Sequence, residues 1–227
     1  MTTAESPQSP VAGYPRLGRV AGAVWFLLLA VFYGRALIAV LETFPPGRPS
    51  FAAWAPVISR GCTLAFFVTL AWLMMARPAA QARRSGLATH AIALGGTYGV
   101  WVVAFLPEAP LSPALSIASA TVTLVGSLLI VFTVVHLGRS FSISPQAREL
   151  VTRGPYAVVR HPLYAAEELA IIGVAMHVVW WAAIPFLLAH LALQIKRMDY
   201  EEGLLWTVFP RYQDYARRTA RWIPGLW

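Results

Sequence analysis

The side chains best suited to chemistry lie in the second half of the chain. Arginine, tyrosine and histidine alternate with apolar residues over 148–164, and this stretch contains an Arg-His-Pro tripeptide at 160–162. Two acids, Glu167 and Glu168, follow inside an apolar run. Acids in such a position are rare and usually face a polar cavity. The pattern is typical of a polar pocket at a membrane surface, although an interfacial loop whose arginines bind phospholipid head groups has the same composition.

A second charged cluster follows the last apolar run of the chain. Arg197 and Glu201 are four residues apart, so they share a face of a helix, as do Tyr164 and Glu168. The planar fork of an arginine can orient a carboxylate. A glutamate can orient an ammonium group through charge-assisted hydrogen bonds. The alternative interpretation is an ion pair between Arg197 and Glu201 at the membrane edge, which contributes only about 0.2–1 kcal/mol.

Composition places these residues next to a lipid bilayer. Of 227 residues, 58% are hydrophobic and 12% are charged, whereas soluble domains average about 45–50% and about 25%. Mean hydropathy is +0.60. Such a chain is too apolar to be disordered, and a soluble globule could not bury this much apolar surface. The net charge of +8 comes from basic residues in short segments between apolar runs, which favours membrane topology and argues against nucleic-acid binding.

Six apolar runs can each form a membrane-associated helix. They cover about residues 18–41, 56–76, 89–106, 114–137, 163–179 and 181–195. We therefore predict an all-α integral membrane protein with five to six transmembrane helices, the last two of which can also form a hairpin that enters the bilayer only partly. The predicted organisation is a disordered tail over 1–15, a four-helix transmembrane scaffold over 16–137, and a catalytic region over 138–227 that ends in an amphipathic segment.

Basic residues favour one side of this bilayer. Arg48 is the only one in the connections on the other side. The alternate connections and the termini hold fifteen, namely Arg16, Arg19, Arg77, Arg83, Arg84, Arg139, Arg148, Arg153, Arg160, Lys196, Arg197, Arg211, Arg217, Arg218 and Arg221. The positive-inside rule places these segments and both termini in the cytoplasm. Frequent arginine and alanine suggest a bacterial source, so we expect a bacterial inner membrane protein with its active site on the cytoplasmic side.

Four motifs in the second half share their order and spacing with a known family. They are Gly154-Pro155-Tyr156, Arg160-His161-Pro162-x-Tyr164, Glu201-Glu202-x-x-Leu205 and Phe209-x-x-Tyr212-x-x-Tyr215. In these motifs the chain resembles the isoprenylcysteine carboxyl methyltransferase family, which belongs to a wider group that includes phospholipid methyltransferases. The resemblance covers about residues 136–225. The chain departs from the family at Glu167 and Glu168, near a position where a small glycine is frequent.

The resemblance implies an enzyme that transfers a methyl group from S-adenosylmethionine to a membrane-partitioned substrate, such as a lipid-like or prenylated small molecule. By position it assigns to the cofactor Arg148, Leu150, Val151, Tyr156, His161 and Glu201. Arg197 falls on an arginine that faces the substrate, so we expect it to act in catalysis. We add Arg160 as a second cation for the cofactor's carboxylate, and Tyr164 from the same motif. Glu168 is added to the substrate site because it shares a helical face with Tyr164.

The methyl acceptor stays open between a carboxylate and an amine. A carboxylate is ionised at pH 7 and needs no general base, so the protein mainly has to align the reactants and exclude water. An amine must lose a proton, and His161, Glu167 or Glu168 would then be the base. His136 and His190 lie in apolar runs, and we expect both to make structural hydrogen bonds. No set of His, Cys and carboxylate residues has metal-site spacing, so we expect no metal.

Two other classes of function fit the same residues. A membrane reductase of the sterol type would bind NADPH, with Arg148, Arg153 and Arg160 as cations for its 2′-phosphate. A non-catalytic membrane subunit or lipid-binding scaffold would bind neither cofactor. Binding of S-adenosylmethionine, of NADPH or of neither distinguishes the three classes.

Overall fold

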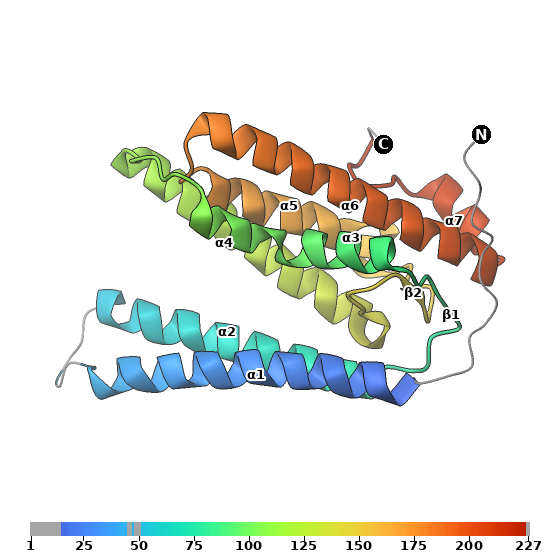
Figure 1. The fold of residues 1–227 in the computed structure, drawn as a ribbon, viewed down its shortest axis with the longest axis horizontal. Helices are drawn as coiled ribbons and strands as arrows, with labels where there is room; N and C mark the ends of the chain where they lie inside the picture. The colour runs from blue at the N-terminus through green and yellow to red at the C-terminus, as the bar shows by residue number, and fades with distance from the viewer. Residues whose placement is uncertain (1–14, 45–46, 48–50, 226–227) are drawn as a thin grey trace. The chain divides into compact units, whose positions relative to one another are not determined.

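Long apolar runs become helices because the bilayer interior offers no hydrogen-bond partner to an exposed peptide group. The structure is a computed structural model that describes residues 15–44, 47 and 51–225 (Figure 1). It is mostly helical, as predicted. Apart from Pro15, the tail predicted to be disordered lies outside the described residues, as does Arg48.

The chain divides into two compact units, one formed by Ala12–Ala79 and the other containing Ala80–Trp227. The first unit consists of helices α1 (Pro15–Glu42) and α2 (Phe51–Ala76). The second contains β1 (Ala82–Arg83), α3 (Leu87–Tyr98), the 3-10 helix η1 (Gly99–Phe105), α4 (Pro113–Leu137), η2 (Gly138–Ser140), β2 (Gln146–Ala147), η3 (Gly154–Ala157), α5 (Pro162–Ala175), α6 (Trp180–Val208) and α7 (Tyr212–Arg218). Helices α3 and α4 therefore pack with the C-terminal region. The division of function at residue 137 stays a prediction.

Helices α1 and α2 run side by side as a hairpin (Figure 1). Phe67 of α2 stacks on Phe26 and Tyr33 of α1, with ring centroids 6.3 and 5.3 Å away. At the open end of the hairpin, Arg77 donates a hydrogen bond to the carbonyl of Gly18 at 3.0 Å. Aromatic packing and one buried guanidinium thus hold this unit together.

Four helical segments among the described residues are long and apolar enough to cross a membrane. They are Gly18–Glu42, Val57–Ala76, Leu87–Phe105 and Pro113–Ser140. Large apolar side chains are exposed along them, and Phe32, Trp72 and Leu128 are 64%, 62% and 61% exposed. Extensive exposed apolar surface marks a contact with a membrane or with protein, and the length and hydropathy of these segments favour the membrane. The prediction of a helical integral membrane protein is confirmed, whereas the crossings made by α5 and α6 and the side of the termini stay predictions.

The last two long helices, α5 and α6, begin next to the starts of the predicted apolar runs. Helix α5 begins at Pro162, as the preference of proline for the first helical position predicts. The sixth apolar run ends near residue 195, and α6 continues beyond it through the charged cluster to Val208, so that Arg197 and Glu201 share a helix as expected. One helix therefore carries both an apolar half and the charged half that contains Arg197 and Glu201.

Two glycines let α4 and α5 approach each other closely. A Cβ at Gly126 would overlap the backbone nitrogen of Ala170, and a Cβ at Gly173 would overlap the hydroxyl of Thr123. The hydroxyl of Ser119 donates a hydrogen bond to the carbonyl of Gly173 at 2.7 Å. Small residues permit such contacts in membranes, where helices associate mainly through van der Waals packing. The helix that starts at the Arg-His-Pro motif is thereby fixed against α4.

Replacement of Gly126 by alanine should lower the thermal stability of the protein in detergent. The added Cβ would overlap backbone atoms of Ala170, which cannot move aside as a flexible side chain can, and overpacking of this kind costs about 1–3 kcal/mol. Gly61→Ala is the matched control, because a Cβ at Gly61 of α2 would meet nothing within 4 Å. The melting temperatures of the two variants decide the matter. Equal stability would contradict the close packing of α4 on α5.

Candidate active site

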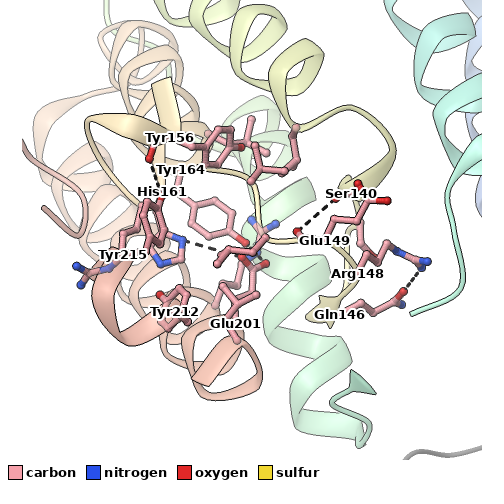
Figure 2. A pocket seen from close by; sticks show the side chains of 18 of the residues that line it. Ser140, Gln146, Arg148, Glu149, Tyr156, His161, Tyr164, Glu201, Tyr212 and Tyr215 are labelled. Carbon is pink, nitrogen blue, oxygen red and sulfur yellow. Dashed lines mark hydrogen bonds and ion pairs between the residues drawn. The ribbon is translucent and has the colours of Figure 1, made fainter. Parts of the chain in front are cut away.

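A pocket opens in the second unit where the loop over 138–151, the motif region over 154–164 and the charged half of α6 meet the C-terminal segment. The space within it is about 820 Å³, part of which is open to solvent. Figure 2 shows four tyrosines, His161 and Glu201 gathered around it, with polar residues of the loop beside them. The lining residues are Leu137, Ser140, Ser142, Ser144, Gln146, Arg148, Glu149, Leu150, Val151, Tyr156, Arg160, His161, Leu163, Tyr164, Arg197, Glu201, Leu205, Tyr212 and Tyr215.

The pocket brings together the residues that the sequence assigned to the cofactor. All eight line it, namely Arg148, Leu150, Val151, Tyr156, Arg160, His161, Tyr164 and Glu201. Arg197, assigned to the substrate, lines it as well, whereas Glu168 does not. The roles of these residues stay predictions, but their common location is a structural fact.

The Arg-His-Pro motif is held by Glu202, the second acid of the pair on α6. Arg160 Nε donates a hydrogen bond to Glu202 Oε1 at 2.8 Å, and His161 Nε2 lies 3.1 Å from the same oxygen. Arg221 Nε approaches Glu202 Oε2 at 3.4 Å. One carboxylate therefore joins the start of α5, the charged half of α6 and the C-terminal segment. The two groups expected to bind a cofactor carboxylate, Arg160 and His161, both contact this protein carboxylate.

The surroundings of Glu202 keep it ionised at neutral pH. Burial alone would raise its pKa, but the hydrogen bonds from His161 and Arg160 and their charges outweigh burial and lower the pKa to about 2. An ionised carboxylate only accepts hydrogen bonds. The Nε2 atom of His161 therefore carries a hydrogen and donates a hydrogen bond to Glu202.

An extended segment near the C-terminus completes this anchor. The backbone amides of Arg160 and His161 donate to the carbonyls of Ala220 and Arg221 at 2.9 and 3.0 Å. One terminal nitrogen of the Arg160 guanidinium also donates to the carbonyls of Ala216 and Thr219, at 2.8 and 2.6 Å. Arg160 is thus used mainly inside the protein, where it ties the C-terminal segment to the motif.

Aromatic rings form one wall of the pocket. His161 and Tyr164 stack with ring centroids 5.6 Å apart and an angle of 12° between the ring planes. The hydroxyl of Tyr215 donates to the carbonyl of Tyr156 at 2.6 Å, which ties α7 to η3. Burial raises the pKa of Tyr215 to about 12 and also raises the pKa of Tyr156, so both phenols stay protonated. Such a wall suits a flat heteroaromatic ring.

The turn that positions Tyr156 requires a glycine. Gly154 has a φ angle of +61°, which glycine adopts without steric cost. A Cβ at this position would also overlap the ring of His136. That ring is fixed in turn, because its Nδ1 lies 2.8 Å from the carbonyl of Phe132. The end of α4 therefore sets where Tyr156 lies, and the expected hydrogen bond of His136 is confirmed.

The polar loop over 142–151 is braced by residues 81–84, which carry no recognisable motif. Strands β1 and β2 pair antiparallel. The side-chain nitrogen of Gln81 donates to the carbonyl of Arg148 at 2.8 Å, and its backbone amide donates to Ala147 at 2.7 Å. The connection between the second and third apolar runs thus positions a loop of the pocket.

Glu201 faces the pocket and remains partly accessible. The hydroxyl of Tyr164 donates to one of its oxygens, and His161 Nδ1 lies 4.0 Å from the other. The side chain of Glu201 is 26% exposed, compared with 16% for Glu202. Of the two acids, Glu201 is therefore the one that a ligand cation can reach.

The two acids of α5 have different partners. Glu168 Oε1 lies 2.6 Å from Nδ1 of His190, and both residues are buried, so the expected hydrogen bonding of His190 is confirmed. Glu167 Oε2 lies 3.3 Å from a terminal nitrogen of Arg197 and accepts a hydrogen bond from Gln194 at 2.7 Å. The structure thus places Glu167, rather than Glu168, beside the arginine assigned to the substrate.

Part of the chain matches the model of a known protein family. The model of the isoprenylcysteine carboxyl methyltransferase (ICMT) family aligns with the chain from within α4 to the end of α6. Residues 118–207 match the ICMT family. The resemblance inferred from the motifs is thereby confirmed over this segment, and ICMT proteins use S-adenosylmethionine.

Two bacterial proteins are similar to part of the chain. The nickel-cobalt-cadmium resistance protein NccN of Alcaligenes xylosoxydans xylosoxydans is 39% identical over 82 residues, which are 36% of this chain and 38% of the relative. The cobalt-zinc-cadmium resistance protein CzcN of Cupriavidus metallidurans is 37% identical over 78 residues, which are 34% of this chain and 36% of the relative. The matched segment spans little more than a third of the length of either relative.

Several residues that line the pocket were not predicted from the sequence. Ser140, Ser142 and Ser144 line it from the loop, and their alternation was the only signal of an extended segment with one polar face. The role of Glu202 as an anchor was not predicted either, because neighbouring acids look alike in a sequence. Among the residues that the structure describes, no group of three or more His, Cys, Asp or Glu is placed to hold a metal ion.

Glu202→Gln should destabilise the protein at neutral pH, and the loss should shrink in acid. The pKa of this carboxyl is about 2 when folded, below its ordinary 4.5. Its stabilising effect is therefore complete above about pH 4.5 and is lost as the pH falls through the folded value. Hydrogen bonds to charged groups contribute about 1.5–3 kcal/mol, and we expect a loss of that size at pH 7. The measurement is the difference in melting temperature between wild type and variant from pH 7 to pH 3. A difference that does not change with pH would exclude the ionised anchor.

Proposed function

We propose that this protein is an S-adenosylmethionine-dependent membrane methyltransferase that methylates a carboxylate on a lipid-like substrate. The observation that carries the proposal is the convergence of eight cofactor-assigned residues, from three separate stretches of sequence, on one pocket. The match of residues 118–207 to the ICMT family supports the same assignment. Methylation of an amine is the second candidate.

The residues of the pocket fit the chemical groups of the cofactor. Glu201 offers an accessible carboxylate to the cofactor's ammonium group. Aromatic and apolar surface for the adenine comes from Leu137, Leu150, Val151, Tyr156 and Tyr212. When bound, S-adenosylmethionine supplies an electrophilic methyl group.

The cofactor's carboxylate requires a cation or backbone amides. Arg160 and His161 bind Glu202, so we assign this role to Arg148. Its backbone carbonyl is held by Gln81 and its guanidinium contacts Gln146. The loop is thereby positioned before any ligand arrives, which reduces the entropy lost on binding.

The partners of the candidate bases favour a carboxylate acceptor over an amine. His161 donates to Glu202, Glu167 accepts from Gln194 and lies beside Arg197, and Glu168 is paired with His190 at 2.6 Å. Each base that an amine would need is engaged with another side chain. A carboxylate acceptor needs no base, because it is already ionised at pH 7.

The residues of the chain would then act by alignment and electrostatics. Arg197 orients the acceptor carboxylate through its guanidinium, which lies 4.5 Å from the ring centroid of Tyr164. The bound cofactor would supply its methyl group to one carboxylate oxygen, giving a methyl ester and S-adenosylhomocysteine. No proton is transferred. Apolar lining residues such as Leu163 and Leu205 exclude water from the reacting groups.

The setting that we propose is a bacterial inner membrane with both termini in the cytoplasm. The excess of basic residues in alternate connections supports this orientation. The two similar proteins, NccN and CzcN, come from bacteria. The active site would then open on the cytoplasmic side, where the cofactor is available.

Glu201→Ala should weaken binding of S-adenosylhomocysteine by roughly 10- to 100-fold, because a charge-assisted hydrogen bond contributes about 1.5–3 kcal/mol. The measurement is titration calorimetry on the detergent-purified protein. Glu108→Ala is the control, because Glu108 is an exposed acid that does not line the pocket. Unchanged affinity in the Glu201 variant would refute its role. Wild-type binding of NADPH instead would favour the reductase, and binding of neither would favour the non-catalytic subunit.

Cysteine labelling tests the proposed orientation. In a variant that lacks Cys62, a membrane-impermeant maleimide should label Arg83→Cys and Arg153→Cys only from the cytoplasm, and Glu108→Cys only from the periplasm. All three positions are exposed. Labelling of position 83 or 153 from the periplasm would overturn the topology.

A further inference from the structure

A polar seam runs through the apolar interior of the second unit. His190, Gln194 and Arg197 lie at positions i, i+4 and i+7 of α6, so they share one face. All three are buried, with 2%, 0% and 3% of their surface exposed. The seam reaches the pocket only at Arg197. Buried polar groups of this kind need partners, and neighbouring helices supply them.

Helix α5 and α6 itself hold one end of the Arg197 guanidinium. One terminal nitrogen donates to Gln194 Oε1 at 2.8 Å and to Glu167 Oε2 at 3.3 Å. The amide of Gln194 donates to that same Glu167 oxygen at 2.7 Å. The three side chains form a closed triangle. Within the described structure Arg197 Nε has no hydrogen-bond partner although it is buried, so this side of the guanidinium retains a donor for a ligand.

Helix α3 supplies the space in which the arginine lies. A Cβ at Gly96 would lie 2.6 Å from Cδ of Arg197, 3.1 Å from its terminal nitrogen and 3.3 Å from Gln194 Oε1. The side chain of Arg197 therefore crosses the backbone of α3 directly over Gly96. Any larger residue there would push the guanidinium out of its present position.

The same glycine is fixed by the other polar pair of the seam. The carbonyl of Gly96 accepts a hydrogen bond from His190 Nε2 at 3.0 Å, and His190 Nδ1 faces Glu168 at 2.6 Å. A carbonyl and a carboxyl oxygen lie at the two ring nitrogens. This connection holds α3, α5 and α6 together at the level of Gly96.

We propose that Gly96 and Glu167 are positioning residues that set where the Arg197 guanidinium lies in the pocket, and so control the acceptor step rather than cofactor binding. The proposal rests on the proposed function, because it assigns Arg197 to the acceptor. Gly96 defines the space for the arginine, and Glu167 fixes the end of its side chain. Glu168 and His190 hold Gly96 in place and do not contact the pocket.

The test compares Gly96→Ala with Gly95→Ala. These are the same substitution at adjacent positions of one helix, but a Cβ at Gly95 would meet only the flexible end of Leu193, at 3.1 Å. The probe acceptor is N-acetyl-S-farnesylcysteine, an isoprenylcysteine with a free carboxylate. Gly96→Ala should lower kcat for this probe by roughly 10- to 100-fold, the effect of a misplacement of about 1 Å. Its Kd for S-adenosylhomocysteine should stay within about twofold of wild type. Gly95→Ala should resemble wild type in both.

A second measurement does not depend on turnover. Phenylglyoxal modifies accessible arginines, and mass spectrometry reports the rate at Arg197. This rate should rise severalfold in Gly96→Ala and in Glu167→Gln, which retains the shape of the glutamate but not its charge, and should not change in Gly95→Ala. Equal rates in all variants would overturn the proposal, as would a parallel loss of kcat and cofactor affinity in Gly96→Ala. Wild-type protein that binds no S-adenosylhomocysteine would instead refute the proposed function, and the modification rates would still decide the positioning of Arg197.

Discussion

The pocket depends on one shared carboxylate. Glu202 accepts from Arg160 and His161 and is approached by Arg221, so three segments that are distant in sequence meet at a single anion. Breaking a buried charge pair is strongly destabilising because the remaining charge loses its partner. Each of the three segments is therefore held by the other two. The aromatic wall and the entrance of α5 take their positions from this contact.

The last two long helices, α5 and α6, each carry two adjacent acids. In each pair the two acids have different partners, and of the four acids only Glu201 lines the pocket. On α6 these are Glu201, which is partly exposed, and Glu202. On α5, Glu167 lies beside Arg197 while Glu168 is buried against His190. Consecutive residues of a helix point about 100° apart, so one acid of a pair can face a ligand while the other is bound by protein.

Much of the fold could be predicted, because the bilayer leaves the backbone few choices. The apolar runs became helices at nearly the expected bounds, since a peptide group in lipid must bond within its own helix. Helix α6 is longer than its apolar run, because the charged residues after residue 195 continue the same helix into the pocket.

The residues of the candidate site that belong to motifs were predictable, whereas the contacts that depend on packing were not. The family resemblance carried by the motifs assigned six of the eight cofactor residues that the pocket contains, and Arg160 and Tyr164 were added from the Arg-His-Pro motif. The resemblance assigned Glu201 rather than Glu202 to the cofactor, but it did not predict that Glu202 holds the Arg-His-Pro motif, because that contact depends on which side of α6 meets Arg160. The hydrogen bond from Gln81 to Arg148 was not predictable either, because the two residues are 67 positions apart in the sequence and Gln81 belongs to no motif. The sequence did not distinguish Gly96 from other glycines, because its importance depends on the side chain of Arg197 that packs against it.

The anchoring of Arg160 by the C-terminal segment has a consequence for the order of biosynthesis. Arg160 precedes its carbonyl partner Thr219 by 59 residues. At roughly 5–20 residues per second, the ribosome makes that stretch in about 3 to 12 seconds. Throughout this interval the motif lacks the C-terminal segment that binds it, and α6 is complete only 11 residues before Thr219. The pocket can therefore close only after residue 219 has been made, when all of its helices already exist.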